Sequence, residues 1–244
     1  SLFPAGSEVR DIAFEDMVLL DERTEIAAVA SMDAPGVAAF AVQTDDDGER
    51  VRRASAALHA VQDGPRQARQ DLAGLLAAHP STVSGEEIRQ SLASRGIEFG
   101  PAFTGLTRVH TTPAGSSLLA EIAAPAAIRA DQSSYGIHPA VLDACFQSVG
   151  AHLLVSGRRE GGLLLPLSVG RLRRFGAGRG ARFCRTTITK ADINVIEADL
   201  EVLDADGEVI LAVTGLRMGS GGTKAAERER LFADRLLTVE WHQR

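Results

Sequence analysis

The feature that most constrains the fold is a nearly unbroken apolar stretch from Gly136 to Leu154. His138 followed by Pro139 marks a helix start, because the fixed φ angle of proline suits the first helical position, where its missing N–H costs no hydrogen bond. The residues from Val141 onward are almost all apolar or small, so we expect a helix that is buried on most sides rather than along one stripe. The sequence therefore predicts a central helix around which the rest of the chain packs.

Two polar groups, Asp143 and Gln147, break the apolar pattern of this helix. They are four residues apart, so their side chains are neighbours on one helix face. A carboxylate inside an apolar helix is costly unless it is paired or protonated, and a protonated carboxyl is what a general acid requires. An aspartate in the second turn can also simply stabilise the positive end of the helix dipole. The pattern by itself leaves both interpretations open.

Three ordered stretches carry a family resemblance. They are F-G-P-A-F-T-G-L from Phe99 to Leu106, H-P-A-V-L-D-A-C-F-Q from His138 to Gln147, and L-P-L-S-V from Leu165 to Val169. In this order and spacing they resemble the motifs of dehydratase domains of bacterial type I polyketide synthases, and the resemblance runs from about Val9 to the end of the chain.

The resemblance implies an α+β double hotdog, in which two long antiparallel sheets each wrap a central helix. Alternating residues predict strands before the central helix and after it. The early strands have no helix of their own to cover one face, so we expect the first hotdog to be incomplete. The expected divisions are strands of the N-terminal hotdog in 1–62, a linker with short helices in 63–98, the C-terminal hotdog in 99–219 and a post-domain linker in 220–244.

The same resemblance implies the roles of individual residues. Asp143 would be the acid that protonates a leaving hydroxyl, and Gln147 would orient it by a hydrogen bond. Phe99 stands where the family usually has tyrosine, so a role for a hydroxyl there is in doubt. The expected substrate-binding residues are Phe99, Gly100, Pro101, Phe103, His138, Leu165 and Pro166. Turn formation or packing is the alternative for the others, and for His138 a structural role at the helix start is the favoured interpretation.

The family's catalytic base is a histidine in an H-x-x-x-G-x-x-x-x-P motif, which this sequence lacks. None of its six histidines has glycine four residues later. We expect that the motif lies upstream of Ser1, so that the chain is an N-terminally truncated dehydratase domain. A domain that has lost activity is the alternative.

Composition excludes several other classes of function. Hydrophobic residues make up 45% of the chain and charged residues 24%, which is ordinary for a globular protein. The net charge of −6 argues against nucleic-acid binding, which rests on basic surface facing phosphate. No apolar run reaches the length of a membrane span. The only two cysteines, Cys145 and Cys184, favour a reduced cytoplasmic setting over a disulfide framework.

The expected activity is removal of water, syn or anti, from a carrier-bound 3-hydroxyacyl thioester to give a 2-enoyl thioester, with no metal or organic cofactor. The family implies an acyl carrier protein and neighbouring synthase domains as partners, and it leaves a homodimer open. A basic cluster could steer the acidic carrier or could be a solvated strand face; it comprises Arg171, Arg173, Arg174, Arg179 and Arg182. The alternative functions are a non-catalytic module that binds acyl chains or scaffolds its neighbours, and a double-bond isomerase or cyclase of the same fold.

Overall fold

The computed structural model describes residues 7–18, 24–46, 48–61, 67–156, 164–176 and 178–220, so the predicted linker at 220–244 lies almost wholly outside the described residues. The elements are β1 (Ser7–Phe14), β2 (Ile26–Ala34), β3 (Val37–Asp46), β4 (Glu49–Ala60), α1 (Leu72–Ala78), β5 (Ser81–Ser84), α2 (Gly85–Ala93), β6 (Leu106–Thr111), β7 (Ser117–Ile122), α3 (Pro139–Val155), β8 (Leu165–Arg174), β9 (Phe183–Ala191), β10 (Val195–Leu203) and β11 (Val209–Gly219). Short 3-10 turns are η1 (Pro101–Phe103), η2 (Ala126–Ile128), η3 (Gln132–Ser134) and η4 (Gly178–Gly180).

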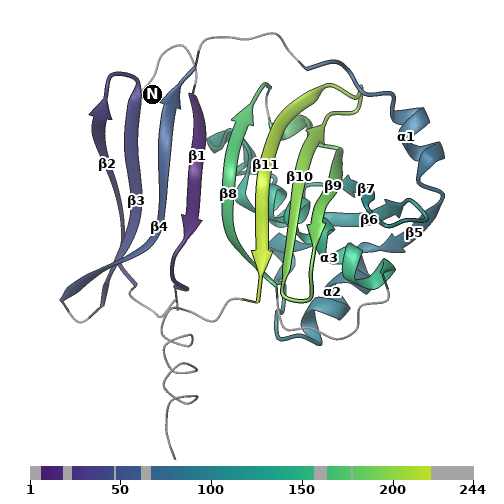
Figure 1. Ribbon diagram of the computed structural model, residues 1–244, viewed down its shortest axis with the longest axis horizontal. Helices are drawn as coiled ribbons and strands as arrows, with labels where there is room; N and C mark the ends of the chain where they lie inside the picture. Colours follow the sequence, from purple (N-terminus) through teal and green to yellow (C-terminus); the bar gives the residue numbers. More distant parts are fainter. Residues whose placement is uncertain are drawn as a thin grey trace, which may run out of the picture.

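All the strands belong to one continuous antiparallel sheet in the order β2-β3-β4-β1-β8-β11-β10-β9-β7-β6-β5 (Figure 1). The two sheets that the resemblance implies are therefore hydrogen-bonded into one in this chain. The join is β1, which pairs with β4 along one edge and with β8 along the other. Pairing both edges of β1 satisfies backbone groups that would otherwise form an open sheet edge.

Strand β1 also differs from its predicted form. The sequence favours a strand from Val9 to Leu20 with a bend near Asp16, but the strand ends at Phe14 and its irregularity lies earlier. Between Arg10 and Ala13 the register against β4 shifts, and Asp11 has a φ angle of 50°. One extra residue in the strand forms a bulge there, which turns the chain locally. The chain does bend at Asp16, just after the strand ends, and the bulge at Asp11 is a further irregularity that was not predicted.

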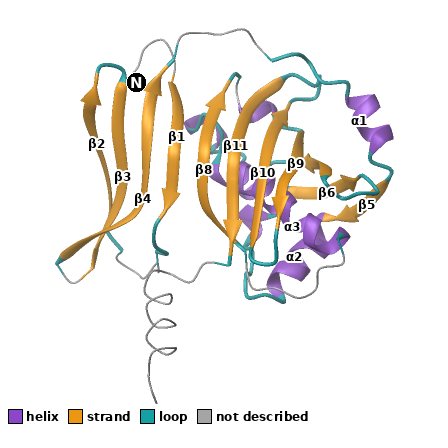
Figure 2. Ribbon diagram, viewed as in Figure 1, coloured by secondary structure: helices purple, strands orange, loops and turns teal. Residues whose placement is uncertain are grey.

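Helix α3 confirms the predicted central helix, with Pro139 as its first residue. Eleven of its 17 residues are buried. It packs against β6, β7, β9 and β10 and against helix α2 (Figure 2). The apolar residues of α3 and the inward side chains of β6–β11 form one core. A long buried helix against a curved antiparallel sheet is the hotdog arrangement predicted for the second half of the chain.

The first four strands in sequence form the other end of the sheet. In the ribbon drawings the helices lie on the side of β5–β11, and no described helix covers β2, β3 and β4 (Figures 1 and 2). Ile26, Val29 and Met32 on β2 are correspondingly exposed.

No helix of the described residues is long and apolar enough to cross a membrane.

The segment between the two groups of strands contains both predicted short helices. Helix α2 begins with the predicted capping box, in which the Ser84 side chain accepts from the backbone of Glu87 and the Glu87 carboxylate accepts from the backbone of Ser84. Strand β5 was not predicted, and it pairs with β6 at the edge of the sheet. Gly85 connects the two elements where no side chain fits, because an added Cβ would lie 1.9 Å from the main-chain oxygen of Leu106. Residues 81–93 thus pack with the later strands.

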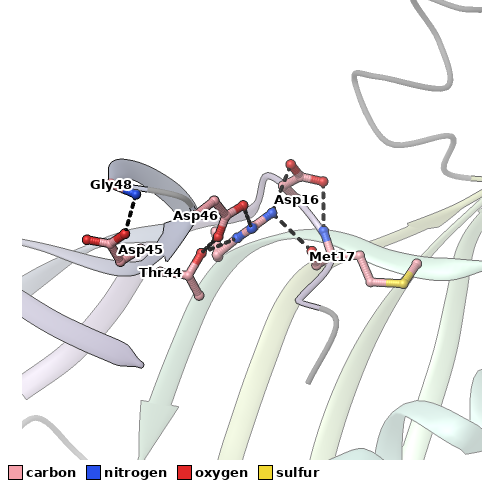
Figure 3. Close-up of polar contacts among 7 residues, drawn as sticks. Asp16, Met17, Thr44, Asp45, Asp46 and Gly48 are labelled. Atoms are coloured by element: carbon pink, nitrogen blue, oxygen red, sulfur yellow. Dashed lines mark hydrogen bonds and ion pairs between the residues drawn. The ribbon is translucent and has the colours of Figure 1, made fainter. Parts of the chain in front are cut away.

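A cluster of ion pairs and hydrogen bonds holds the ends of β1, β3 and β4 together (Figure 3). The largely buried guanidinium of Arg53 forms ion pairs with Asp16 and Asp46, and it donates to Thr44 Oγ1 at 2.7 Å and to the main-chain oxygen of Met17 at 3.1 Å. Hydrogen bonds from Thr44 and then from Arg53 lower the pKa of Asp46. These contacts fix the chain where it leaves β1.

Candidate active site

The predicted pair on α3 is in direct contact. Gln147 donates from Nε2 to Asp143 Oδ2 at 2.7 Å and to the main-chain oxygen of Phe103 at 3.0 Å. The first bond follows from the four-residue spacing on one helix face. The second ties the amide to turn η1, so the orientation of Gln147 is set by a segment 44 residues earlier in the chain.

Burial dominates the electrostatics of Asp143. Loss of water around its carboxyl raises the pKa, and the hydrogen bond from Gln147 opposes that rise without cancelling it. Burial disfavours the charged form of a carboxyl, so the proton is held to higher pH than in an exposed aspartate. Burial of the carboxyl is the feature that the first of the two interpretations from the sequence requires.

The other end of the Gln147 amide is unsatisfied. Its Oε1 atom is buried and has no hydrogen-bond partner among the described residues. A buried acceptor without a partner costs about 1–3 kcal/mol, so such atoms are uncommon and call for an explanation. Gln147 lines a cavity, but its Oε1 atom is not exposed on the cavity surface.

This cavity has a volume of about 190 Å³ and three walls. One wall is a stripe along α3 that begins at Asp143 and ends at Leu153. The second is formed by Leu92 near the end of α2 and by the residues that follow it. The third is a row across the sheet, where Pro166 of β8 is opposite Met218 of β11, and Met218 is opposite Ile196 of β10. Nearly all the lining side chains are apolar.

The cavity brings together five of the predicted site residues, which are Phe99, Asp143, Gln147, Leu165 and Pro166. Gly100, Pro101 and Phe103 do not line it. Gly100 and Pro101 begin turn η1. The Phe103 side chain is 39% exposed, and its contribution is the main-chain oxygen that holds Gln147.

His138 also lies outside the cavity lining and has a local structural part. It caps α3, because its Nδ1 accepts from the backbone N–H of Ala140 at 3.1 Å. Its ring stands edge-on to Tyr135 with the ring centroids 4.8 Å apart. No other described histidine lines the cavity either: His110 contacts Glu121, and His152 contacts the main-chain oxygen of Gly115.

Several lining residues were missed by sequence reasoning. Phe146 and Leu153 follow Asp143 at intervals of three and ten residues, so the helical period could have identified them. Val149 lies on α3 as well, next to Gly150, which the sequence places three residues after Gln147 on the same face. The others come from distant segments with no local signal; they are Leu92, Arg95, Ile97, Leu164, Ile196 and Met218.

The basic cluster is largely engaged in internal contacts. Arg171 forms an ion pair with the buried carboxylate of Glu8, which Arg10 shares. The guanidinium of Arg173 lies 5.2 Å from the ring centre of Phe175. Two of the remaining members contact main chain, Arg174 packing over Gly136 and Arg182 donating to the oxygen of Ala181 at 2.9 Å. The side chain of Arg179 lies outside the described residues.

Within the described ranges no group of three or more acidic, histidine or cysteine side chains is arranged to hold a metal ion.

Comparison with known proteins gives the family. The model of the polyketide synthase dehydratase N-terminal domain matches residues 67–228. The chain is 50% identical over 98% of its length to a mycocerosic acid synthase-like polyketide synthase of Mycobacterium tuberculosis. It is 48% identical over 98% of its length to a phthioceranic/hydroxyphthioceranic acid synthase of Mycobacterium bovis. It spans only 12% and 11%, respectively, of those two proteins.

Solved structures agree with this assignment. The dehydratase domain of a mycocerosic acid synthase-like polyketide synthase matches with a TM-score of 0.83 and 45% identity, over 88% of this chain and 76% of that one. A dehydratase domain of a trans-AT polyketide synthase from Brevibacillus brevis has the same fold, with a TM-score of 0.81 at 15% identity, over 89% of this chain and 77% of that one. With its hotdog fold and its matching sequence, the chain belongs to the dehydratase domains of polyketide synthases.

Proposed function

We propose that this domain removes water from a carrier-bound 3-hydroxyacyl thioester to give the 2-enoyl thioester, with Asp143 as the acid. The observation that carries the proposal is the Asp143 carboxyl itself. It lies on the wall of an apolar cavity, its pKa is raised by burial, and it accepts a hydrogen bond from Gln147. A positioned acid with a raised pKa is what protonation of a poor leaving group at neutral pH requires.

In the proposed reaction a base takes the proton from C2, and the electron pair of that C–H bond forms the C2–C3 double bond. The C3–O bond breaks, and Asp143 gives its proton to the departing hydroxyl, which leaves as water. Because Gln147 donates to Oδ2, the transferable proton is left to Oδ1. The same hydrogen bond stabilises the carboxylate that forms, since bonds to charged groups are the stronger ones.

The base and the wider assembly are part of the same proposal. The family's histidine motif is absent from these 244 residues, and we assign the base to a segment outside them. We assign the first four strands to the N-terminal hotdog, which shares the sheet with the C-terminal one. A carrier protein and neighbouring synthase domains are the proposed partners, supported by relatives of which this chain spans about an eighth. We also propose that the domain needs no cofactor for catalysis and that it is located in the cytoplasm.

The test is mass spectrometry of a 3-hydroxyacyl pantetheine thioester incubated with this chain and with a form that is extended upstream in its parent polypeptide. We expect loss of water with the extended form only. Asp143→Asn in the extended form should abolish it, and Asp131→Asn, at an exposed position in the loop before α3, should leave it unchanged. Water loss that survives Asp143→Asn would refute the assignment of the acid.

A non-catalytic acyl-binding module is the second candidate, and one observation favours it: no described histidine lines the cavity beside Asp143. The same experiment separates the two. Absence of water loss from both forms, with binding of the thioester retained, would establish the binding module. Turnover by the short form would mean that a base lies within these residues, and His110 and His152 would be the first to replace.

A further inference from the structure

The cavity is polar at one end and apolar along the rest of α3. Asp143 lies in the second turn of the helix and Gln147 at its middle, and the stripe continues through Gly150 to Leu153. Seven residues separate Asp143 from Gly150, which is about 10 Å along a helix axis at 1.5 Å per residue. An alkyl chain whose C3 lies at Asp143 therefore has about this length of apolar wall beside it.

Gly150 is the smallest residue on this wall, and its backbone conformation does not require glycine. Its φ angle is not in the left-handed region, and a Cβ added to it would meet no atom closer than Leu92 Cδ2 at 3.6 Å, an ordinary contact distance. Gly85 is the opposite case, because its Cβ would overlap main chain. Glycine is also a poor helix former. The backbone therefore does not require glycine at position 150, and the packing of α2 on α3 leaves room there for a Cβ in van der Waals contact with Leu92 and Ile88.

Helix α2 packs directly over Gly150, where an added Cβ would lie 3.6 Å from Leu92 Cδ2 and 3.9 Å from Ile88 Cγ2. Leu92 and Gly150 face each other from α2 and α3, and both line the cavity. Atoms added beyond a Cβ at position 150 must either push Leu92 aside or enter the cavity. The size of residue 150 thus determines how much of the apolar wall is available to a ligand.

We propose that Gly150 sets the length of acyl chain that this domain accepts, because side-chain atoms added beyond a Cβ there would enter the cavity or displace Leu92 within its wall. The inference rests on the proposed function only in placing C3 of the acyl group at Asp143. It makes Gly150 a specificity-determining position, and it assigns the apolar part of the cavity to the alkyl end of the substrate.

The length of the apolar wall and the volume of the cavity both limit the length of the acyl chain. An extended chain advances about 1.2 Å per bond, so 10 Å accommodates about eight or nine carbons. An apolar cavity of about 150 Å³ in another protein binds benzene, so one of about 190 Å³ takes six carbons with some room to spare. The site accordingly holds about six to nine carbons beyond C3.

The test is calorimetric titration of this chain with saturated acyl pantetheine thioesters of about 4 to about 16 carbons, which bind without reacting. Affinity should rise about fourfold for each buried methylene and then level off at about 9 to 12 carbons. Gly150→Ala should bring the levelling-off about one carbon earlier and Gly150→Val about three, because the added atoms fill close-packed space. Leu154→Val is the matched control: it adds a β-branched residue to α3 at a position that does not line the cavity, and it should change nothing.

An unchanged levelling-off length in both Gly150 variants would overturn the proposal, and so would a wild-type affinity that does not depend on chain length. The alanine variant decides the question if the valine variant does not fold, because replacing glycine by alanine favours a helix. Failure of the proposed function is a separate result. A chain that binds with the expected length limit but never removes water, even when extended, would retain the inference and refute the dehydratase activity.

Discussion

Replacement of Gln147 by methionine tests the electrostatics of the Asp143 pair directly. The two side chains are similar in size, but methionine has no N–H to donate. The variant loses the bonds to Asp143 Oδ2 and to the main-chain oxygen of Phe103, and it also removes the buried Oε1 atom that has no partner. Its effect on stability should therefore depend on whether Asp143 is ionised.

The magnitude follows from three contributions. Loss of the bond to the Phe103 oxygen costs about 1 kcal/mol, and relief of the buried Oε1 returns about 1–3 kcal/mol, at any pH. Loss of the bond to Asp143 costs about 0.5–1.5 kcal/mol when the carboxyl is protonated and about 1.5–3 kcal/mol when it is ionised. The variant should thus be close to wild type in stability at acid pH and lower by a further 1–1.5 kcal/mol, roughly, at alkaline pH.

The sign agrees with linkage. Burial raises the pKa of Asp143 in the folded protein, so the stability contributed by this group is full below the pKa of the unfolded chain and is lost as the pH rises through the folded pKa. Gln147 opposes the rise in pKa. Without it the folded pKa rises further, and more stability is lost over that interval.

Urea unfolding followed by circular dichroism at about pH 4 and about pH 8 measures the difference, because the midpoint and slope give the free energy of unfolding at each pH. The same pair of measurements in an Asp143→Asn background is the control, and there the pH dependence of the Gln147→Met effect should vanish. The reasoning is refuted if the effect of Gln147→Met is the same at both pH values, or if its pH dependence survives in the Asn background.

Three further outcomes follow from the packing. Ser84→Ala should lower the free energy of unfolding by about 1 kcal/mol in urea titrations, through loss of the capping box, while acyl-thioester affinity stays at the wild-type level. Gly178→Ala should destabilise by roughly 1–3 kcal/mol in thermal unfolding, because the new Cβ would lie 2.5 Å from the oxygen of Gly136; an unchanged melting temperature would contradict this. Cys145 and Cys184 are buried, and a hydrogen bond with Cys184 and then burial raise the pKa of the Cys145 thiol, so mass spectrometry should detect alkylation only after denaturant is added.

The elements that the sequence predicts well are those with local causes. The start of α3 is determined by His138 and Pro139, whose backbone preferences act within two residues. Likewise, the capping box at Ser84 needs only residues three apart. Asp143 and Gln147 contact each other for the same reason, since a helix brings residues four apart together whatever surrounds it. These features depend on residues close together in the sequence and do not depend on the tertiary fold.

The features that the sequence does not predict depend on distant pairing. Strand β5 has four residues and little apolar character, and it is a strand only because β6 pairs with it. The bulge at Asp11 arises from the register between β1 and β4, which no local pattern encodes. The cavity is a similar case, because Ile196 and Met218 reach it through a row of cross-strand pairs. Helical period finds one wall of the cavity and leaves the other two unseen.

The position of Asp143 on a buried helix gives the cavity a property that a loop site would lack. Burial both raises the pKa of its carboxyl and holds the helix that carries it, because the opposite face of α3 packs into the core. An alkyl chain that fills the cavity displaces the water remaining beside the carboxyl, and removal of water raises a carboxyl pKa further. Occupancy by the acyl group should therefore strengthen the hold of Asp143 on its proton. In the proposed reaction the substrate itself would then keep Asp143 protonated, and a chain too short to reach Gly150 would do so least.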